Sequence, residues 1–206
     1  MGKFTAKNYE HLLGSPGFSD DMLKDHFKLY AGYVAKINEI DTALSEASPA
    51  GNYSYTQFSE LKRREAVAFN GMRLHELYFD NLTAGAGTSP SSELSTALKA
   101  KFGSDDAWEA YFKACGSSVI GWTALTVSRT DHAAGDENPL RISIFEEHHR
   151  NGLVEQEPIL IMDVYEHAFV RDFGIDKGAY MKAFFAAIDW DVVNARYVKA
   201  LTALKG

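Results

Sequence analysis

Four ionisable side chains lie inside or directly beside apolar stretches of the sequence. His26 and His75 each share the apolar face of a long helical pattern, and Asp163 directly follows the apolar run 158–162. His167 comes four residues after Asp163. A buried carboxylate without a partner costs several kcal/mol, so Asp163 needs a cation or hydrogen-bond donors beside it. Three imidazoles and one carboxylate would supply the ligands of a single metal ion, and we interpret the four residues as that set.

Each of these residues also has a simpler interpretation. A histidine on the apolar stripe of a helix is commonly a hydrogen-bonded core residue, and an aspartate after a strand is commonly a helix cap. The four together favour a metal, but their types leave two kinds of chemistry open. The set suits zinc with a water for hydrolysis, and it equally suits iron or manganese for redox reactions. No further carboxylate is clearly placed as the general base that hydrolysis requires.

Two long helices are expected to position His26 and His75. Apolar residues recur at spacings of three and four from Asp20 to Leu44, and again from about Thr56 to Leu82. A loop rich in Ser, Gly and Tyr at 48–55 joins the two patterns. Two long helices with a short connection predict an antiparallel hairpin, which can turn both histidines toward the same interior.

The rest of the chain changes from helical to strand patterns and back. The expected elements are helices at 92–102 and 104–115, strands at 121–129, 140–145 and 158–162, a hairpin loop at 131–139, and a helical tail over 175–204. The fold class is therefore α+β, with an N-terminal antiparallel helical hairpin followed by a C-terminal lobe that combines a three-stranded antiparallel sheet with helices. The Gly- and Ser-rich run 85–92 predicts domains at 1–87 and 92–206.

The composition restricts the cellular compartment and the kinds of partner that we expect for the protein. The 206 residues are 46% hydrophobic and 24% charged, which is typical of globular proteins. No apolar run approaches the roughly 20 residues that span a bilayer, and a net charge of −7 without a basic run argues against nucleic acid. The single cysteine, Cys115, fits a reducing compartment. We expect a cytoplasmic protein with no membrane and no nucleic-acid partner.

The segment 163–169, Asp-Val-Tyr-Glu-His-Ala-Phe, closely resembles the Asp-Val-Trp-Glu-His-Ala-Tyr signature of iron/manganese superoxide dismutases. Three further segments resemble the same family in the same order: 26–34, 69–79 and 119–125. The resemblance covers nearly the whole chain and implies the hairpin-plus-sheet fold. It also implies an antioxidant enzyme that converts superoxide to dioxygen and hydrogen peroxide at one iron or manganese ion per subunit.

The resemblance assigns roles to individual residues. The positions that match the metal ligands of the family are His26, His75, Asp163 and His167. Tyr33 matches the tyrosine at the substrate funnel. His148 stands where many members carry a glutamine that hydrogen-bonds the metal-bound solvent, and the neighbouring His149 is the alternative for this role. Because the net charge is −7, attraction of superoxide would have to come from local positive charge.

Other matched positions surround the site or reach the partner subunit. Trp122 and Tyr165, with Phe79 and Trp190, resemble the aromatic shell. Glu166 matches the glutamate that bridges to a ligand histidine of the partner subunit, which implies a homodimer or a homotetramer.

Four departures from the family pattern fall near the site. The segment from His26 to Tyr33 is one residue shorter than usual, and Leu74 replaces an asparagine before the second helix ligand. Tyr30 replaces a second histidine and Val170 replaces a tyrosine, at two positions that normally pair across the dimer interface. Two alternatives to a dismutase therefore stay open, a degenerate relative with a structural or metal-binding role and a zinc hydrolase on the same ligands.

Overall fold

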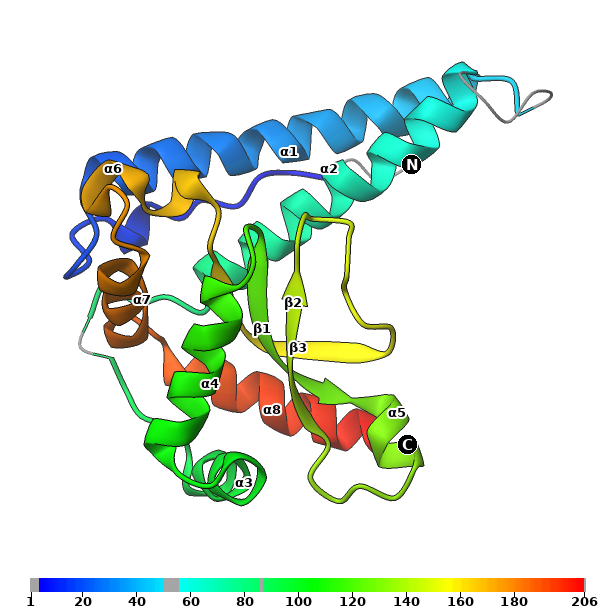
Figure 1. The fold of residues 1–206 in the computed structure, drawn as a ribbon. Helices are drawn as coiled ribbons and strands as arrows, with labels where there is room; N and C mark the ends of the chain where they lie inside the picture. The colour runs from blue at the N-terminus through cyan, green and yellow to red at the C-terminus, as the bar shows by residue number, and fades with distance from the viewer. Residues whose placement is uncertain (1–3, 50–55, 86, 206) are drawn as a thin grey trace.

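Two long antiparallel helices form the first part of the fold (Figure 1). The computed structural model describes residues 4–49, 56–85 and 87–205. Helix α1 spans Asp20–Glu46 and packs along α2, Gln57–Asp80. The Ser19 hydroxyl accepts a hydrogen bond from the Met22 N–H and so caps α1. The predicted hairpin is confirmed, while most of its predicted loop lies outside the described residues.

The second part is a three-stranded sheet with helices around it. Its elements are α3 Ser92–Phe102, α4 Asp105–Ser117, β1 Trp122–Ser128, α5 Arg129–Ala133, β2 Leu140–Phe145, β3 Gln156–Asp163, α6 Val170–Phe173, α7 Lys177–Ala186 and α8 Trp190–Leu204. The chain also forms short 3-10 turns, η1 at Glu10–Leu12 and η2 at Glu166–Ala168. Both strand pairs are antiparallel and the strand order is β2-β1-β3. The predicted α+β class is confirmed.

The connection between β1 and β2 differs from the predicted simple hairpin loop. It begins with the short helix α5. The Ser128 hydroxyl accepts a hydrogen bond from the Asp131 N–H, and this cap starts one helical turn before the chain reverses. The turn-forming residues at 131–139 predicted the reversal of the chain, but the cap that Ser128 provides at the end of the strand was not predicted.

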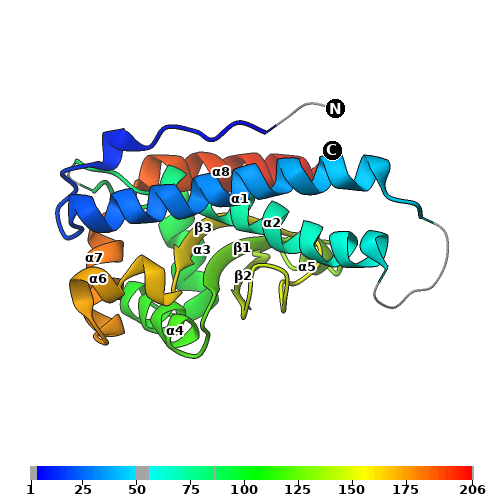
Figure 2. The same ribbon diagram turned by 90° about the horizontal axis from the view of Figure 1, so that it is seen from above.

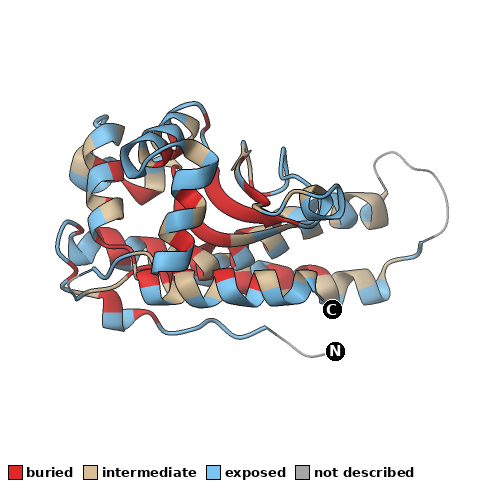
Figure 3. Ribbon diagram, turned by 90° about the horizontal axis from the view of Figure 1, so that it is seen from below, coloured by how far each residue is buried: buried red, intermediate tan, exposed pale blue. Residues whose placement is uncertain are grey.

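Layers on both sides of the sheet bury its central strand. Helix α4 contacts β1 and β2, whereas α8 contacts β1 and β3, and α2 also contacts β3. Figure 2 shows α4 and α8 on opposite sides of the sheet. All seven residues of β1 are buried, while the outer faces of α1 and α2 are exposed (Figure 3). The carboxyl end of β3 therefore meets α2 in the interior.

Within the three described ranges, no helix combines the length and the apolar character needed to cross a membrane.

Candidate metal centre

The fold brings together the four residues whose types suggested a metal. His26 comes from α1, His75 from α2, Asp163 from the last position of β3, and His167 from η2. One ligand atom of each lies within 4.8 Å of those of the others. Asp163 is the centre of the group, since its Oδ2 lies 3.2, 3.6 and 3.1 Å from the Nε2 atoms of His26, His75 and His167.

A local turn aims Asp163 and His167 at one another. The Asp163 Oδ1 accepts a hydrogen bond from the Tyr165 N–H at 2.9 Å, which leaves Oδ2 free to face the histidines. The main chain then enters η2, and this turn carries His167 back toward the carboxylate four residues earlier. Trp122 pairs with Asp163 across β1 and β3, so the sheet fixes the base of this turn.

The surroundings of His75 fit those of a metal ligand. Its Nδ1 lies 2.5 Å from the Gly71 carbonyl oxygen, so Nδ1 carries the proton and donates it there. Its Nε2 is buried and has no hydrogen-bond partner, and its lone pair faces Asp163. A buried polar atom without a partner is costly and rare. A metal ion between the imidazoles and Asp163 would satisfy this atom, so the donor set fits iron or manganese.

Electrostatics favour the protonation states that a metal needs. Burial lowers the pKa of His26 and His75, and the neighbouring His26 lowers that of His75 further. Burial alone would raise the pKa of Asp163, but His167 and His26 hold it well below its usual range. Metals bind deprotonated ligands. At neutral pH the site therefore offers an ionised carboxylate and two neutral imidazoles, and Asp163 raises the pKa of His167 against the effect of burial.

Tyr33 faces the same interior despite the shortened segment that precedes it. Because α1 is a regular helix, seven residues make about two turns, and Tyr33 lies on the same face as His26. The Tyr33 ring centroid is 5.3 Å from that of His75. A Cβ added to Gly71 would lie 2.6 Å from Tyr33 Cδ1, so only glycine allows this close packing.

His148 joins Tyr33 to Trp122. The indole N–H of Trp122 donates to His148 Nδ1 at 3.0 Å, and His148 Nε2 lies 2.7 Å from the Tyr33 hydroxyl. Since Nδ1 is the acceptor, Nε2 carries the proton of the neutral ring and donates to Tyr33. His149 is exposed, and its Nδ1 lies 3.7 Å from Glu147. Of the two neighbouring histidines, only His148 contacts Tyr33.

Aromatic rings enclose the four residues. Trp122 packs edge-on against His75 at 4.9 Å, Phe79 lies 4.8 Å from His26, and Tyr165 stacks on His167 at 5.2 Å. Trp190, which the sequence resemblance placed in this shell, instead packs against Trp108. A shell of this kind limits the access of water to the site.

Two further residues support the site without having been singled out. The Tyr180 hydroxyl donates to the main-chain carbonyl of Asp163, and the Asn70 amide donates to that of His148 at 2.9 Å. Asn70 belongs to the Phe69-Asn70-Gly71 segment that carried part of the resemblance, so its motif was the available signal. Tyr180 carries no such signal, because one tyrosine in a helical tail resembles any other core aromatic residue.

Glu166 and Tyr30 differ in their surroundings. Glu166 is exposed, and its carboxylate has no hydrogen bond or ion pair within the described part of the chain. Tyr30 is buried, and its hydroxyl donates to Glu76 Oε1 and accepts from the Lys7 N–H, both at 3.0 Å. The Tyr30 hydroxyl is thus engaged within the chain.

The pKa of His148 predicts a pH dependence of stability. Burial lowers this pKa to about 4, while in the unfolded chain it is about 6.5. As pH falls from 6.5 to 4 the unfolded chain takes up a proton that the folded chain does not, so stability is lost by up to about 3 kcal/mol. We expect the metal-free His148→Gln variant to lose less stability than the unmodified protein over this window, by urea unfolding.

The matched control is His149→Gln, which changes an exposed neighbour. Its unfolding free energy should run parallel to that of the unmodified chain between pH 6.5 and 4. If His148→Gln also runs parallel, the buried neutral imidazole is not the origin of the slope.

Comparisons with known proteins agree with this geometry. Residues 90–196 match the model of the C-terminal domain of iron/manganese superoxide dismutases. A protein of Aquifex pyrophilus named superoxide dismutase [Fe] is 35% identical, over 98% of this chain and 96% of its own. One of Cupriavidus metallidurans, also named superoxide dismutase [Fe], is 34% identical over 90% and 91% of the two chains. Haloferax volcanii superoxide dismutase [Mn] 2 is 31% identical over 94% of each chain. The chain therefore belongs to the iron/manganese superoxide dismutase family.

Proposed function

We propose that the protein dismutates superoxide to dioxygen and hydrogen peroxide at one iron or manganese ion held by His26, His75, Asp163 and His167. The observation that carries the proposal is the unpartnered, buried Nε2 of His75, which faces an ionised carboxylate inside a cluster of three imidazoles. When bound, the ion supplies the one-electron oxidation and reduction that dismutation needs. A superoxide assay on purified protein loaded with each metal tests the proposal.

The charges of the ligands suit an anionic substrate. Asp163 contributes one negative charge, and neutral imidazoles contribute none, so a divalent ion would keep a net charge of about +1. This local positive charge can attract superoxide although the protein as a whole carries −7. The aromatic rings of Trp122, Phe79 and Tyr165 keep the dielectric constant around it low, which strengthens the attraction.

Tyr33 is the proposed proton donor to the substrate side of the site. His148 Nε2–H donates to the Tyr33 oxygen, so the Tyr33 hydroxyl hydrogen is free to point elsewhere. Burial and the charge of Asp163 raise the pKa of Tyr33, which keeps its hydroxyl protonated at neutral pH. Trp122 fixes the tautomer of His148 through its indole N–H. The three residues thus hold one proton at the Tyr33 oxygen in a defined orientation.

Tyr33→Phe tests this role. The variant keeps the ring that packs on Gly71 and His75, so we expect metal content within the error of the unmodified protein. It lacks the hydroxyl, and we expect the dismutation rate to fall about a hundredfold, the low end of the contribution of a positioned proton donor. Stopped-flow decay of superoxide measures the rate.

The control for Tyr33→Phe is Tyr111→Phe, which removes an exposed hydroxyl on α4. Tyr111→Phe should change neither metal content nor rate. A rate for Tyr33→Phe within twofold of the unmodified protein at all pH values would remove Tyr33 from the proton path.

We also propose that the protein forms a homodimer in which Glu166 reaches the partner subunit's His167. The His167 side chain is 30% exposed, while the other three side chains of the cluster are at most 1% exposed. Its second ring nitrogen has no partner within the described part of the chain. Val170, four residues after Glu166, is an apolar residue that is 43% exposed. A two-fold contact would cover these groups, and two dimers could form a homotetramer.

The alternatives are not favoured. A degenerate relative would be expected to have lost part of the ligand set, and this chain keeps all four residues in one cluster. A zinc hydrolase would not account for full-length similarity to proteins named as superoxide dismutases. The single cysteine supports the assignment of this activity to the cytoplasm, where thiols stay reduced.

A further inference from the structure

A buried carboxylate that the proposed reaction does not use lies directly beside His75. The Glu76 side chain is 7% exposed. Two neighbours compensate its charge: the Arg73 guanidinium forms an ion pair with Oε2, and the Tyr30 hydroxyl donates to Oε1 at 3.0 Å. Since α2 carries both residues, any movement of Glu76 along or around the helix axis also moves His75.

The N-terminal segment holds the other side of Tyr30. We call residues 4–9 the N-terminal strap; it runs alongside α1 in Figure 2. The Lys7 N–H donates to the Tyr30 hydroxyl oxygen at 3.0 Å. The Tyr30 hydroxyl therefore lies between a main-chain amide of the strap and the carboxylate of Glu76.

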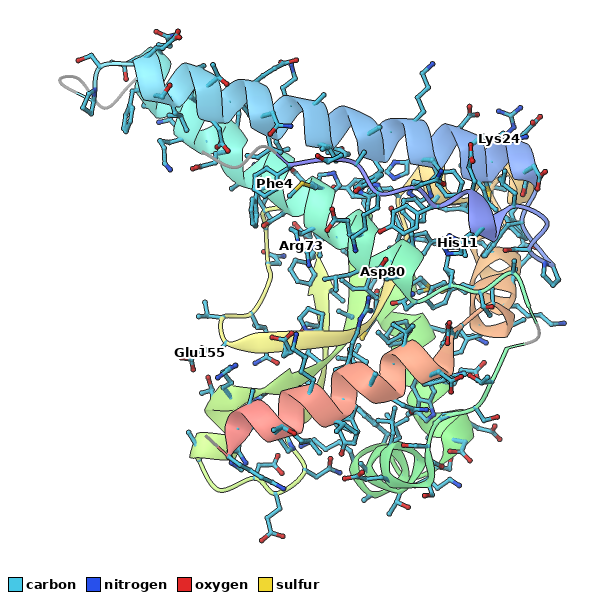
Figure 4. The ribbon with its side chains drawn as sticks, turned by 180° about the vertical axis from the view of Figure 1, so that it is seen from behind. Phe4, His11, Lys24, Arg73, Asp80 and Glu155 are labelled. Carbon is cyan, nitrogen blue, oxygen red and sulfur yellow. The ribbon has the colours of Figure 1, made fainter. Side chains whose placement is uncertain are left out.

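Two more contacts tie the strap to α2 one turn beyond Glu76. The Lys7 ammonium lies 2.9 Å from Asp80 Oδ2, and the Tyr9 hydroxyl donates to Asp80 Oδ1 at 3.0 Å. In Figure 4, Asp80 marks the end of α2, and Phe4 and His11 mark the segment that passes it. Lys7 thus bonds to Tyr30 through its main chain and to α2 through its side chain.

The strap also packs behind the ligands. The Tyr9 ring lies 4.8 Å from Phe79 and 5.7 Å from Tyr30, and Phe79 lies 4.8 Å from His26. Ring contacts therefore connect Tyr9 of the strap through Phe79 to the imidazole of His26. Since Asp163 Oδ2 is 3.6 Å from His75 Nε2, a small shift of α2 would change the space available to the ion.

We infer that Tyr30 is a positioning residue for His75. Its hydroxyl links the strap to Glu76, and this link fixes the height and rotation of α2 at the ligand. The inference rests on the proposed function, because it takes His75 to bind the metal. A site can hold the correct ligands and still bind loosely when the residues that support them can move.

Two variants break the link from opposite sides, and one preserves it. Tyr30→Phe removes the donor and Glu76→Leu removes the acceptor, whereas Glu76→Gln keeps an oxygen that can accept from Tyr30. The proteins are full-length and iron-loaded. Three quantities are measured: the rhombicity of the ferric EPR spectrum, the rate of iron release to a chelator, and the melting temperature with and without iron.

We expect Tyr30→Phe and Glu76→Leu to alter the EPR rhombicity and to speed iron release on the order of tenfold, the lower end of effects seen for residues that orient ligands. The double variant should be no worse than either single one, because both remove the same link. Glu76→Gln should keep the unmodified spectrum. The iron-loaded melting temperature should fall more than the iron-free one.

A contact of the strap far from His75 provides the control. The Asn38 side chain pairs with the main chain of Phe4 through bonds of 2.9 and 2.8 Å. Asn38→Ala should lower both melting temperatures equally and leave the spectrum and iron release unchanged. If Tyr30→Phe behaves in the same way, its role is structural only and the inference is wrong. If the unmodified chain takes up iron but shows no dismutase activity, the proposed function is wrong. The positioning of His75 is still tested in that case, because the EPR spectra of the variants decide it.

Discussion

Replacing Asp163 with alanine is expected to abolish metal binding. The carboxylate is the point on which the three Nε2 atoms converge, and it is the single negative charge in the cluster. Without it a cation would meet three neutral imidazoles in a buried site, with no anion to offset its own desolvation. We expect elemental analysis to find less than about a tenth of the metal content of the unmodified protein. Substitution of residues that only support the ligands lowers metal affinity or activity about 10–100-fold, and Asp163 is itself a ligand.

The same variant should lose the stability that the metal confers. An ion present at about 1,000 times its dissociation constant stabilises the folded state by about 4 kcal/mol, and that increment disappears with binding. His167→Ala removes one imidazole and should show the same loss of metal. Asp106→Ala, an exposed aspartate of α4, is the control and should keep its metal. Full metal occupancy in Asp163→Ala would remove this cluster from the account.

Glu166→Ala is expected to yield monomers that retain metal poorly. A ligating histidine generally donates its second ring N–H to an acceptor, which fixes its orientation. Within the described part of the chain His167 has no such acceptor, and Glu166 is exposed without a partner of its own. Under two-fold symmetry one residue type would supply both acceptors, so the single substitution removes both contacts.

Sedimentation and elemental analysis of the same sample test the two effects together. Because the Tyr30 hydroxyl is bonded to Glu76 and Lys7 within its own chain, it cannot replace the lost contact. Glu137→Ala, an exposed glutamate in the loop before β2, should remain a metal-loaded dimer. A fully active dimer of Glu166→Ala would show that the interface is built elsewhere.

The hairpin and the sheet could be predicted because local signals agree with tertiary burial. Ser19 caps α1 at the start of the predicted helical pattern, and the apolar run before Asp163 is a buried strand. Helix α5 was missed because it depends on one side-chain cap, from Ser128. The η2 turn was missed because its three residues are too few for a periodic pattern. The division into domains at 1–87 and 92–206 stays a prediction.

The candidate ligands could be predicted because charged groups inside apolar patterns are conspicuous. What surrounds them could not be predicted in the same way. The link from Tyr30 to Glu76 joins two helices at 46 residues' separation, and a sequence pattern carries no information about which buried hydroxyl meets which carboxylate. The choice between His148 and His149 likewise depends on which side chain turns inward beside Tyr33 and Trp122.

The chain is similar to proteins named for iron and to proteins named for manganese. Its four candidate ligands suit either metal, so the residues around them are expected to decide between the two. Hydrogen bonds near a metal tune its redox potential, and here Trp122, His148 and Tyr33 form a chain of such bonds at the site. These residues are the place to look for metal preference.

We expect the cluster of His26, His75, Asp163 and His167 to bind a redox metal and to use it on superoxide. The direct measurement is metal analysis of the purified protein, followed by a superoxide assay after reconstitution with iron, manganese or zinc in turn. We predict about one ion per chain, activity in proportion to iron or manganese content, and none with zinc. A protein that holds zinc tightly, or that binds iron and manganese fully without accelerating the decay of superoxide, would contradict the account.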